Sequence, residues 1–345
     1  MHLTNLAEGT APLTDTNLPE LTVQPSATLG KQLQLFVLPI ATTALLFGFA
    51  LIDSRVVSPG NLINILQQTS YLSVFAVAQT IVLITRGLDL ALGPTVSMVS
   101  VGAALAMTQF LDPSTTSISI VLVGLLIGVG LGWLVGLFNG FVVAILRVNP
   151  FIATLGSYNI ALGIATTLSG GRPVQNVPDV FTNVFYSGSV LGVPAAILFA
   201  VVIWVALHLM LNHTIFGRSL YLIGTNVRAA SVAGIPTRRV LMLAYLLCSS
   251  LSAIGALMLT ARTGSGEPNL GGSLSLQALA AALVGGVSLT GGTGSVGAAL
   301  LGSVFVTILS NGMNLVQLNG NIQLIVLGTI VIFGVTLDQY RTRHK

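Results

Sequence analysis

Long apolar stretches without a charged residue recur along the chain, and short polar segments separate them. A helix needs about 20 apolar residues to cross the hydrocarbon core of a bilayer, so each stretch predicts one membrane-spanning helix. Ten stretches contain no Asp, Glu, Lys or Arg: 33–52, 62–85, 90–110, 118–146, 151–168, 192–212, 240–261, 274–290, 296–316 and 321–337. The pattern therefore predicts an all-α integral membrane protein with about ten transmembrane helices, forming one domain over residues 33–338.

The pattern is least regular between residues 274 and 316. There the segment GGVSLTGGTGS, residues 285–295, separates two apolar stretches, and its glycines fit either a loop or a re-entrant turn. Both chain ends differ from the apolar body. Residues 1–32 hold three prolines and no apolar core of signal-peptide length, which predicts a flexible cytoplasmic tail. Residues 339–345 predict a short basic cytoplasmic tail.

The basic residues orient the predicted helices. Ten crossings divide the Lys and Arg residues into a larger set on one side and three, Arg55, Arg172 and Arg262, on the other. The larger set comprises Lys31, Arg86, Arg147, Arg218, Arg228, Arg238, Arg239, Arg341, Arg343 and Lys345. Cytoplasmic loops carry the excess of Lys and Arg, so both termini are predicted in the cytoplasm.

Composition agrees with a surface that faces lipid. Only 6% of the residues are charged and 53% are hydrophobic, whereas about a quarter of the residues of a soluble domain are charged. The net charge of +4 is therefore interpreted as a signal of membrane topology, and nucleic acid is not expected as a partner.

Short matches between the two halves of the chain indicate an internal repeat. The matches are Arg86 with Arg262, Asn139-Gly140 with Asn311-Gly312, and Leu155-Gly156 with Leu327-Gly328, at offsets of 172 to 176 residues. Predicted spans two to five would then correspond to spans seven to ten. Copies separated by five helices run in opposite directions, which is the inverted repeat found in many transporters.

Glycine recurs at every fourth position of the fourth predicted span, at Gly124, Gly128, Gly132, Gly136 and Gly140. This spacing places the five glycines near one face of a helix. Small residues on one face allow another helix backbone to approach closely within a membrane. We therefore interpret this face as a site of helix packing.

The longest predicted cytoplasmic connection spans residues 213–239. Within it, Asn226 can cap a short helix over residues 227–233, Gly234 suits the left-handed position after the helix, and Pro236 prevents its continuation. Such a helix is too short to cross a membrane. It is either a passive interfacial linker or a docking surface for a cytoplasmic partner.

The chain lacks the residues of several kinds of active site. A phosphate-binding Walker loop needs Gly-Lys-Ser/Thr, and neither Lys31 nor Lys345 stands in such a motif. The four histidines are scattered, and Cys248 is the only cysteine, so no metal or nucleophilic site is predicted. The protein is therefore expected to be neither an ATPase nor another enzyme.

Five segments resemble, in the same order, permease subunits of the ribose/xylose/galactoside-type sugar ABC importers. They are RGLDLALG (86–93), NGFVVAILRVNPFIATLG (139–156), LIGTNVRAASVAGIP (222–236), ALVGGVSLTGGTGSVGAALLG (282–302) and LSNGMNLV (309–316). The resemblance covers about residues 35 to 338. Permeases for branched-chain amino acids are related and share a similar architecture, so the family is better defined than the substrate.

This resemblance implies a type II ABC importer permease similar to the ten-helix cobalamin permease, located in a bacterial inner membrane. It also implies three kinds of partner: a cytoplasmic ATPase that binds ATP and Mg, a periplasmic sugar-binding protein, and a second permease copy or paralogue. No cofactor is implied for this chain itself. The resemblance further assigns coupling to the ATPase to Gly224, Asn226, Ala229, Ala230 and Gly234.

Three functions compete for these residues: an ATP-driven importer subunit, a self-sufficient channel or secondary transporter, and an intramembrane enzyme. Ion-coupled transporters usually place ionisable residues within their spans, and the predicted spans have none; Asp89 is expected to pair with Arg86 at an interface. The importer is favoured. Uncharged spans also favour a neutral solute. The resemblance implies a pentose or hexose, with a branched-chain amino acid or a nucleoside as the alternative.

Polar side chains on two predicted spans are candidates for the solute path. Asn64, Gln67, Gln68 and Tyr71 share one face of a helix because they follow one another at helical spacing. Asn311, Asn314 and Gln317 follow at intervals of three near the periplasmic end of another span. Amides facing lipid are costly, so both sets should point inward, either to join helices or to line a wet vestibule.

Overall fold

A computed structural model describes residues 28–109 and 117–343 of the chain. Ten helices in this part follow the order of the ten predicted spans. They are α1 (Thr28–Ile52), α2 (Pro59–Ile84), α3 (Leu92–Gln109), α4 (Ser117–Gly140), α5 (Pro150–Ser169), α7 (Ala195–His213), α10 (Thr237–Thr263), α11 (Leu274–Gly285), α12 (Val296–Leu315) and α13 (Gly320–Arg343). The prediction of an all-α membrane protein is confirmed.

Shorter elements connect these helices. They are η1 (Ser54–Val57), η2 (Phe141–Ile145), α6 (Asp179–Thr182), η3 (Asn183–Ser187), α8 (Ile215–Thr225), α9 (Val227–Val232) and the two-residue antiparallel strands β1 (Ser189–Val190) and β2 (Val193–Pro194). Five helical stretches in the described part of the chain are long and apolar enough to cross a membrane, and three apolar helices are shorter: Phe36–Ile52, Leu274–Gly285 and Gly320–Thr336.

Contacts divide the chain into two units, Met1–Val37 and Leu38–Lys345. The described part of the first unit, from Thr28, is helical. The predicted N-terminal tail lies mostly outside the described residues. At the other end, α13 continues to Arg343, so most of the predicted basic tail extends this helix. The architecture below is that of the second unit.

Side-chain caps mark where several long helices begin. The Ser58 hydroxyl accepts from the backbone N–H of Asn61, and Pro59 occupies the first turn of α2. The Asn149 side chain caps α5, which also begins with a proline, and Ser295 caps α12. Each cap supplies an acceptor for an N–H group that has no partner within its own helix.

The pairing of helices follows the predicted repeat. α2 packs against α11 and α12, and the corresponding α10 packs against α3 and α4. Likewise α3 contacts α4 and α5, while α11 contacts α12 and α13. Two four-helix halves therefore make matching sets of contacts, as expected if spans two to five and seven to ten are copies of one unit.

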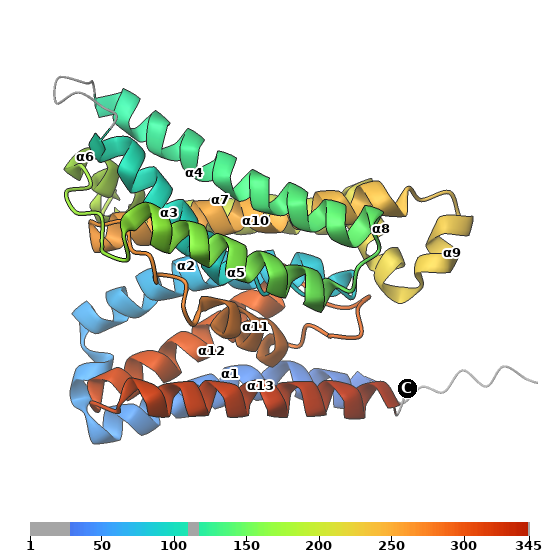
Figure 1. Ribbon diagram of the computed structural model, residues 1–345. Helices are drawn as coiled ribbons and strands as arrows, with labels where there is room; N and C mark the ends of the chain where they lie inside the picture. The colour runs from blue at the N-terminus through green and yellow to red at the C-terminus, as the bar shows by residue number, and fades with distance from the viewer. Residues whose placement is uncertain (1–27, 110–116, 344–345) are drawn as a thin grey trace, which may run out of the picture. The chain divides into compact units, whose positions relative to one another are not determined.

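The glycine face of α4 packs mainly along α10 (Figure 1). A Cβ at Gly132 would lie 2.7 Å from the Ala253 Cβ and 2.8 Å from the Ser249 carbonyl oxygen. Gly128, Gly136 and Gly140 likewise meet residues of α10, whereas Gly124 meets Met107 and Phe181. The interpretation of this face as a packing surface is confirmed.

The prediction that residues 274–290 form one complete helical span is wrong. α11 has 12 residues, or about 18 Å at the usual rise per residue, which is too short for a hydrocarbon core of about 30 Å. Non-helical residues 264–273 precede it, just as residues 85–91 precede α3. Residues 286–295 after α11 form a glycine-rich loop, with Gly286, Gly291, Gly292 and Gly294 at positive φ.

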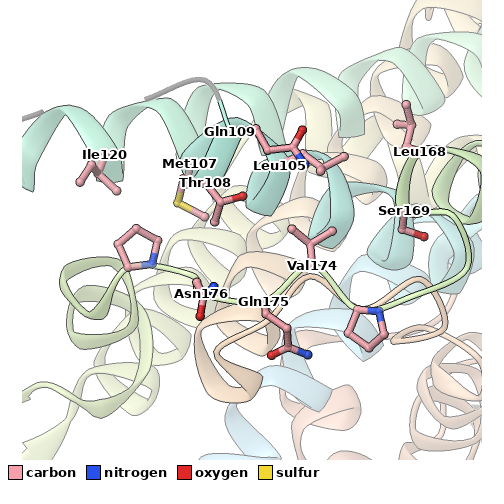
Figure 2. A pocket seen from close by; sticks show the side chains of 12 residues that line it. Leu105, Met107, Thr108, Gln109, Ile120, Leu168, Ser169, Val174, Gln175 and Asn176 are labelled. Atoms are coloured by element: carbon pink, nitrogen blue, oxygen red, sulfur yellow. The ribbon is translucent and has the colours of Figure 1, made fainter. Parts of the chain in front are cut away.

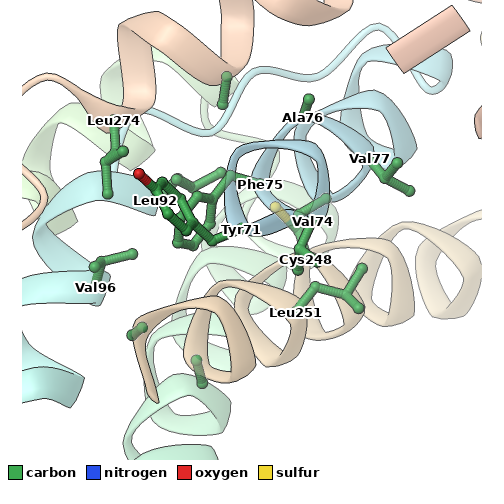
Figure 3. Packing of buried hydrophobic residues seen from close by; sticks show 14 of the residues in the cluster. Tyr71, Val74, Phe75, Ala76, Val77, Leu92, Val96, Cys248, Leu251 and Leu274 are labelled. Atoms are coloured by element: carbon green, nitrogen blue, oxygen red, sulfur yellow. The ribbon is translucent and has the colours of Figure 1, made fainter. Parts of the chain in front are cut away.

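The first turns of α3 and α11 meet inside the protein. The Ser275 hydroxyl accepts from the Gly93 N–H at 2.8 Å and donates to the Leu90 carbonyl at 2.9 Å. A Cβ at Gly271 would overlap the carbonyl oxygen of Gly93. The apolar core surrounds this junction, and Figure 3 shows Phe75, Leu92, Cys248 and Leu274 among its members.

Candidate functional site

The α2 residues predicted to line the path lie on one face, and two of them, Gln67 and Tyr71, hydrogen-bond other elements. The Gln68 amide donates to Asn64 Oδ1 at 3.0 Å within the helix. Tyr186 from η3 donates to Gln67 Oε1 at 3.5 Å. Asn64, Gln67 and Gln68 are all half-buried, and Tyr186 connects their face to a neighbouring helical turn.

Tyr71 is buried at the far end of this face and binds Arg262. The Arg262 guanidinium donates to the Tyr71 hydroxyl at 2.5 Å, and its Cζ lies 5.3 Å from the ring centroid. The phenol thus receives both a hydrogen bond and a cation–π contact. Sequence reasoning used Arg262 for the topology and for the internal repeat, and did not place it beside Tyr71.

The three candidates at the end of α12 and in the turn after it differ in burial and in their hydrogen-bond partners. Asn311 is buried and pairs with Asn61 through two amide hydrogen bonds of 2.9 and 3.0 Å. Asn314 is exposed and accepts from Gln323 at 2.6 Å. Gln317 lies in the turn after α12 with φ of 58°. Asn61 was missed, although it lies one helical turn before Asn64 on the same face.

A cavity of about 720 Å³ lies elsewhere, between the ends of α3, α4 and α5. Its lining includes Thr108, Gln109, Gln175 and Asn176 but none of the seven predicted path residues. Figure 2 shows Val174, Gln175 and Asn176 on the segment that follows α5. That segment is fixed by paired backbone hydrogen bonds of 2.8 Å between Val174 and Gly266.

The capped helix predicted in the connection 213–239 is present as α9. The Asn226 side chain accepts from the N–H groups of Arg228 and Ala229, each at 3.0 Å. Gly234 has φ of 82°, and the next helix begins directly after Pro236. The start, the left-handed glycine and the role of proline are therefore as predicted. Val232 presents an apolar side chain that is 90% exposed.

The five predicted coupling residues face different ways. Gly224 points inward, where a Cβ would overlap the Ile84 carbonyl oxygen, and Ala230 is buried. Asn226 and Ala229 are exposed at the start of α9, and a Cβ at Gly234 would meet nothing within 4 Å. The segment therefore has one face packed on the protein and one face free within the single chain.

The helix α8 before this segment was not predicted. Its signals were Thr214, whose hydroxyl caps the helix by accepting from the Gly217 N–H at 3.1 Å, and the apolar positions Leu220 and Ile223, both fully buried. Tyr221 donates to the Gly294 carbonyl at 2.8 Å. Burial raises the pKa of the Tyr221 phenol above its ordinary value. α8 and α9 lie together beside α10 (Figure 1).

The predicted pairing of Asp89 with Arg86 is wrong. Asp89 is buried and accepts from the Ala91 N–H at 2.9 Å and from the Asn139 amide at 3.5 Å. Arg86 instead donates from Nε to the Gly224 carbonyl at 2.5 Å and from Nη2 to the Thr225 carbonyl at 2.7 Å. Arg86 has φ of 64°, so the chain leaves the helix here and the two side chains point apart.

No group of three or more His, Cys, Asp or Glu side chains that could hold a metal ion occurs in residues 28–109 and 117–343. Cys248 is fully buried in α10.

A family model described as the permease component of a branched-chain amino acid transport system matches residues 61–335. The ribose import permease protein RbsC of Bacillus subtilis is 32% identical over 315 residues, which cover 91% of this chain and 93% of RbsC. The probable ABC transporter permease protein y4mJ of Sinorhizobium fredii is 35% identical over 294 residues, or 84% of this chain and 85% of y4mJ.

The galactose/methyl galactoside import permease protein MglC of Escherichia coli is also similar, with 33% identity over 312 residues covering 85% of this chain and 90% of MglC. No solved structure matches the chain.

Proposed function

The chain belongs to the family of permease components of branched-chain amino acid transport systems, and from this premise we propose that it is the membrane-spanning subunit of an ATP-driven importer for a neutral monosaccharide. The sugar is a pentose or hexose that a periplasmic binding protein delivers. Transport proceeds by alternating access of a path across the membrane.

The substrate class is supported chiefly by the similar proteins. RbsC of Bacillus subtilis is named a ribose import permease, and the similarity extends over 91% of this chain. MglC is named for galactose and methyl galactoside. The ten charge-free stretches support the same class, because a charged solute crossing them would meet no counter-charge there.

A separate ATPase must supply the energy, because the chain has no Walker lysine. ATP and Mg then bind to that partner and not to this subunit. The exposed face of α9, with Val232 and the capped turn at Asn226, supports docking of the ATPase at this end. In this arrangement α8, α9 and both termini lie in the cytoplasm of a bacterial cell, in agreement with the excess of arginines on that side. A second permease copy or paralogue completes the membrane part.

The α2 face formed by Asn64, Gln67, Gln68 and Tyr71 supplies the proposed solute contacts. Amide groups can replace water around sugar hydroxyls, and the Tyr71 ring offers an apolar surface. Asn314 on α12 and Gln317 in the turn after α12 are further candidates. Asn311 is the weakest candidate, because Asn61 already satisfies its amide.

Reconstitution in liposomes tests this proposal. The permease is combined with an ATPase and a binding protein of the proposed importer, with ATP enclosed, and uptake of radiolabelled ribose, galactose, leucine and a nucleoside is measured. We expect concentrative uptake of a monosaccharide that requires all components. If only leucine or only the nucleoside is taken up, that solute and not a sugar is the substrate. Concentrative uptake by the permease without the ATPase would reveal a secondary transporter and overturn the importer proposal.

A further inference from the structure

The short turn between α2 and α3 forms hydrogen bonds with several other elements. Between Ile84 and Leu90, five positions each bond to a different part of the protein. The Ile84 carbonyl accepts from the Gly292 N–H at 2.8 Å. The Leu88 carbonyl accepts from Thr154 of α5 at 3.3 Å, and the Leu90 carbonyl accepts from Ser275 of α11 at 2.9 Å. The other two positions, Arg86 and Asp89, bond through their side chains.

Arg86 holds the outer side of this turn against α8. Its two donors reach the Gly224 and Thr225 carbonyls, the last of which ends α8. Terminal carbonyls of a helix lack intrahelical partners and carry partial negative charge, so a guanidinium is a favourable partner for them. The glycine-rich loop fills the remaining space, because a Cβ at Gly291 would meet Arg86 and one at Gly292 would meet Thr225.

Asp89 holds the inner side of the same turn. Its carboxyl group accepts from Ala91 at the start of α3 and from Asn139 at the end of α4. Asn139 in turn accepts from Ser157 of α5 at 2.6 Å. A displacement of residues 84–90 would therefore act on α3, α4 and α5 together, and through Ser275 on the first turn of α11.

We propose that Arg86 is a positioning residue that transmits movement of the α8–α9 segment to the junction of α3 and α11. The proposal rests on the proposed function, in which the ATPase docks on α8 and α9. The guanidinium donates two hydrogen bonds to carbonyl groups at the end of α8. A displacement of α8 away from the membrane domain would therefore displace the turn 84–90 as well. Without those bonds, α8 and α9 still dock the ATPase, but the turn does not follow them.

The left-handed backbone at Arg86 supplies a matched control. Arg147 is also a non-glycine residue at positive φ, 58° against 64° for Arg86. Its side chain is exposed and forms no hydrogen bond with another residue of the described part of the chain. Asparagine tolerates the left-handed region, so Arg86→Asn and Arg147→Asn remove one guanidinium each from similar backbone conformations.

Each complex of permease, ATPase and binding protein is purified and reconstituted, and sugar uptake and ATP hydrolysis are measured in the same vesicles. For Arg86→Asn we expect normal co-purification of the ATPase, retained ATP hydrolysis, and uptake per ATP hydrolysed lower by about tenfold or more, because two bonds from a charged donor are lost. Arg147→Asn should match the natural protein. Arg86→Lys, which keeps a charge but has no planar fork, should give an intermediate ratio.

Three results would overturn the proposal. An unchanged ratio of uptake to hydrolysis in Arg86→Asn shows that the contact does not transmit movement. Loss of ATPase binding by Arg86→Asn makes Arg86 a part of the docking surface only. If the Arg86→Asn permease does not assemble with its partners, the test rests on Arg86→Lys. A normal ratio of uptake to hydrolysis in that variant then counts against the proposal. Failure of the natural protein to bind an ATPase would instead refute the proposed function.

Discussion

Asp89 is buried where the chain turns from α2 into α3, and it forms no ion pair within the described part of the protein. A buried carboxyl group is costly unless hydrogen bonds compensate it. Here the compensation comes from the Ala91 N–H and from the Asn139 amide. The side chain thereby serves as the acceptor that the first turn of α3 needs.

Replacing Asp89 tests this role. Asp89→Ala removes the acceptor for Ala91 and leaves the Asn139 amide unsatisfied, so we expect a loss of about 1–3 kcal/mol of stability. Asp89→Asn keeps an acceptor oxygen and should lose less. Thermal unfolding of the two purified variants in the same detergent shows which of them is the more stable. Equal stability of Asp89→Ala and the natural protein would contradict the assigned hydrogen bonds.

Arg86 and Asp89 show that residue spacing alone does not identify which side chains contact each other. Positions i and i+3 face each other only while the backbone stays helical, and Arg86 adopts φ of 64° instead. Non-glycine residues seldom adopt this conformation, so the sequence carried no sign of it. The partners of Arg86, Gly224 and Thr225, are also 138 and 139 positions away along the chain, where no local pattern could identify them.

At the scale of elements, α4 and α10 offer a test of close packing. Gly132→Val places a branched side chain against Ala253 and the backbone of Ser249. Overpacking of this kind costs about 1–3 kcal/mol or more. A Cβ at Gly130, two positions earlier on the same helix, would meet nothing within 4 Å. We expect Gly132→Val to lower the thermal midpoint and the yield of monodisperse protein, and Gly130→Val to leave both nearly unchanged.

The exposed face of α9 is the second test at this scale. Val232→Asp places a charge at an apolar position that is 90% exposed in the single chain, and Leu191→Asp does the same at the turn between β1 and β2, where Leu191 is fully exposed. If the ATPase covers α9, Val232→Asp should reduce co-purification of the ATPase by about tenfold or more, while Leu191→Asp should not. Equal co-purification of both variants would remove Val232 from the docking surface.

Element prediction succeeded where lipid imposes a simple rule. A membrane requires long apolar helices whose backbone groups are satisfied internally, and the ten helices occur in the predicted order. α11 departs from the rule because its neighbours, and not lipid, enclose the non-helical residues 264–273. The apolar composition of 274–290 does not distinguish a 12-residue helix from a complete span. α8 was missed because a capped, amphipathic helix outside the apolar stretches resembles a polar connection.

At the scale of the whole molecule, the repeat explains why two helices, α3 and α11, begin inside the protein. α3 and α11 occupy corresponding places in the two halves, and Ser275 joins their first turns. Backbone that is not helical is tolerated at membrane depth only when protein or water surrounds it. The two halves thus bury each other's irregular segments. Three short matches were enough to predict the repeat, but not this junction, which depends on side chains from both halves.

The solute path itself requires a measurement on the assembled importer. Cysteines are placed at positions 64, 68, 71 and 314 in a Cys248→Ser background, which removes the natural thiol. Leu191→Cys, fully exposed, and Val74→Cys, fully buried, serve as the reactive and unreactive controls. A membrane-impermeant thiol reagent is then added from the periplasmic side.

If the α2 face lines the path, the cysteines at 64 and 68 should react, because a wet vestibule admits the reagent. Tyr71 is buried beside Arg262, so its cysteine should react more slowly than the other two. Transported sugar or the ATP-bound state should change these rates, since both alter access to the path. Asn314 is exposed in the single chain, so protection of its cysteine in the complex would place it under a partner. Cysteines at 64 and 68 that stay as unreactive as Val74→Cys in every state would make the α2 amides contacts between helices and exclude them from the path.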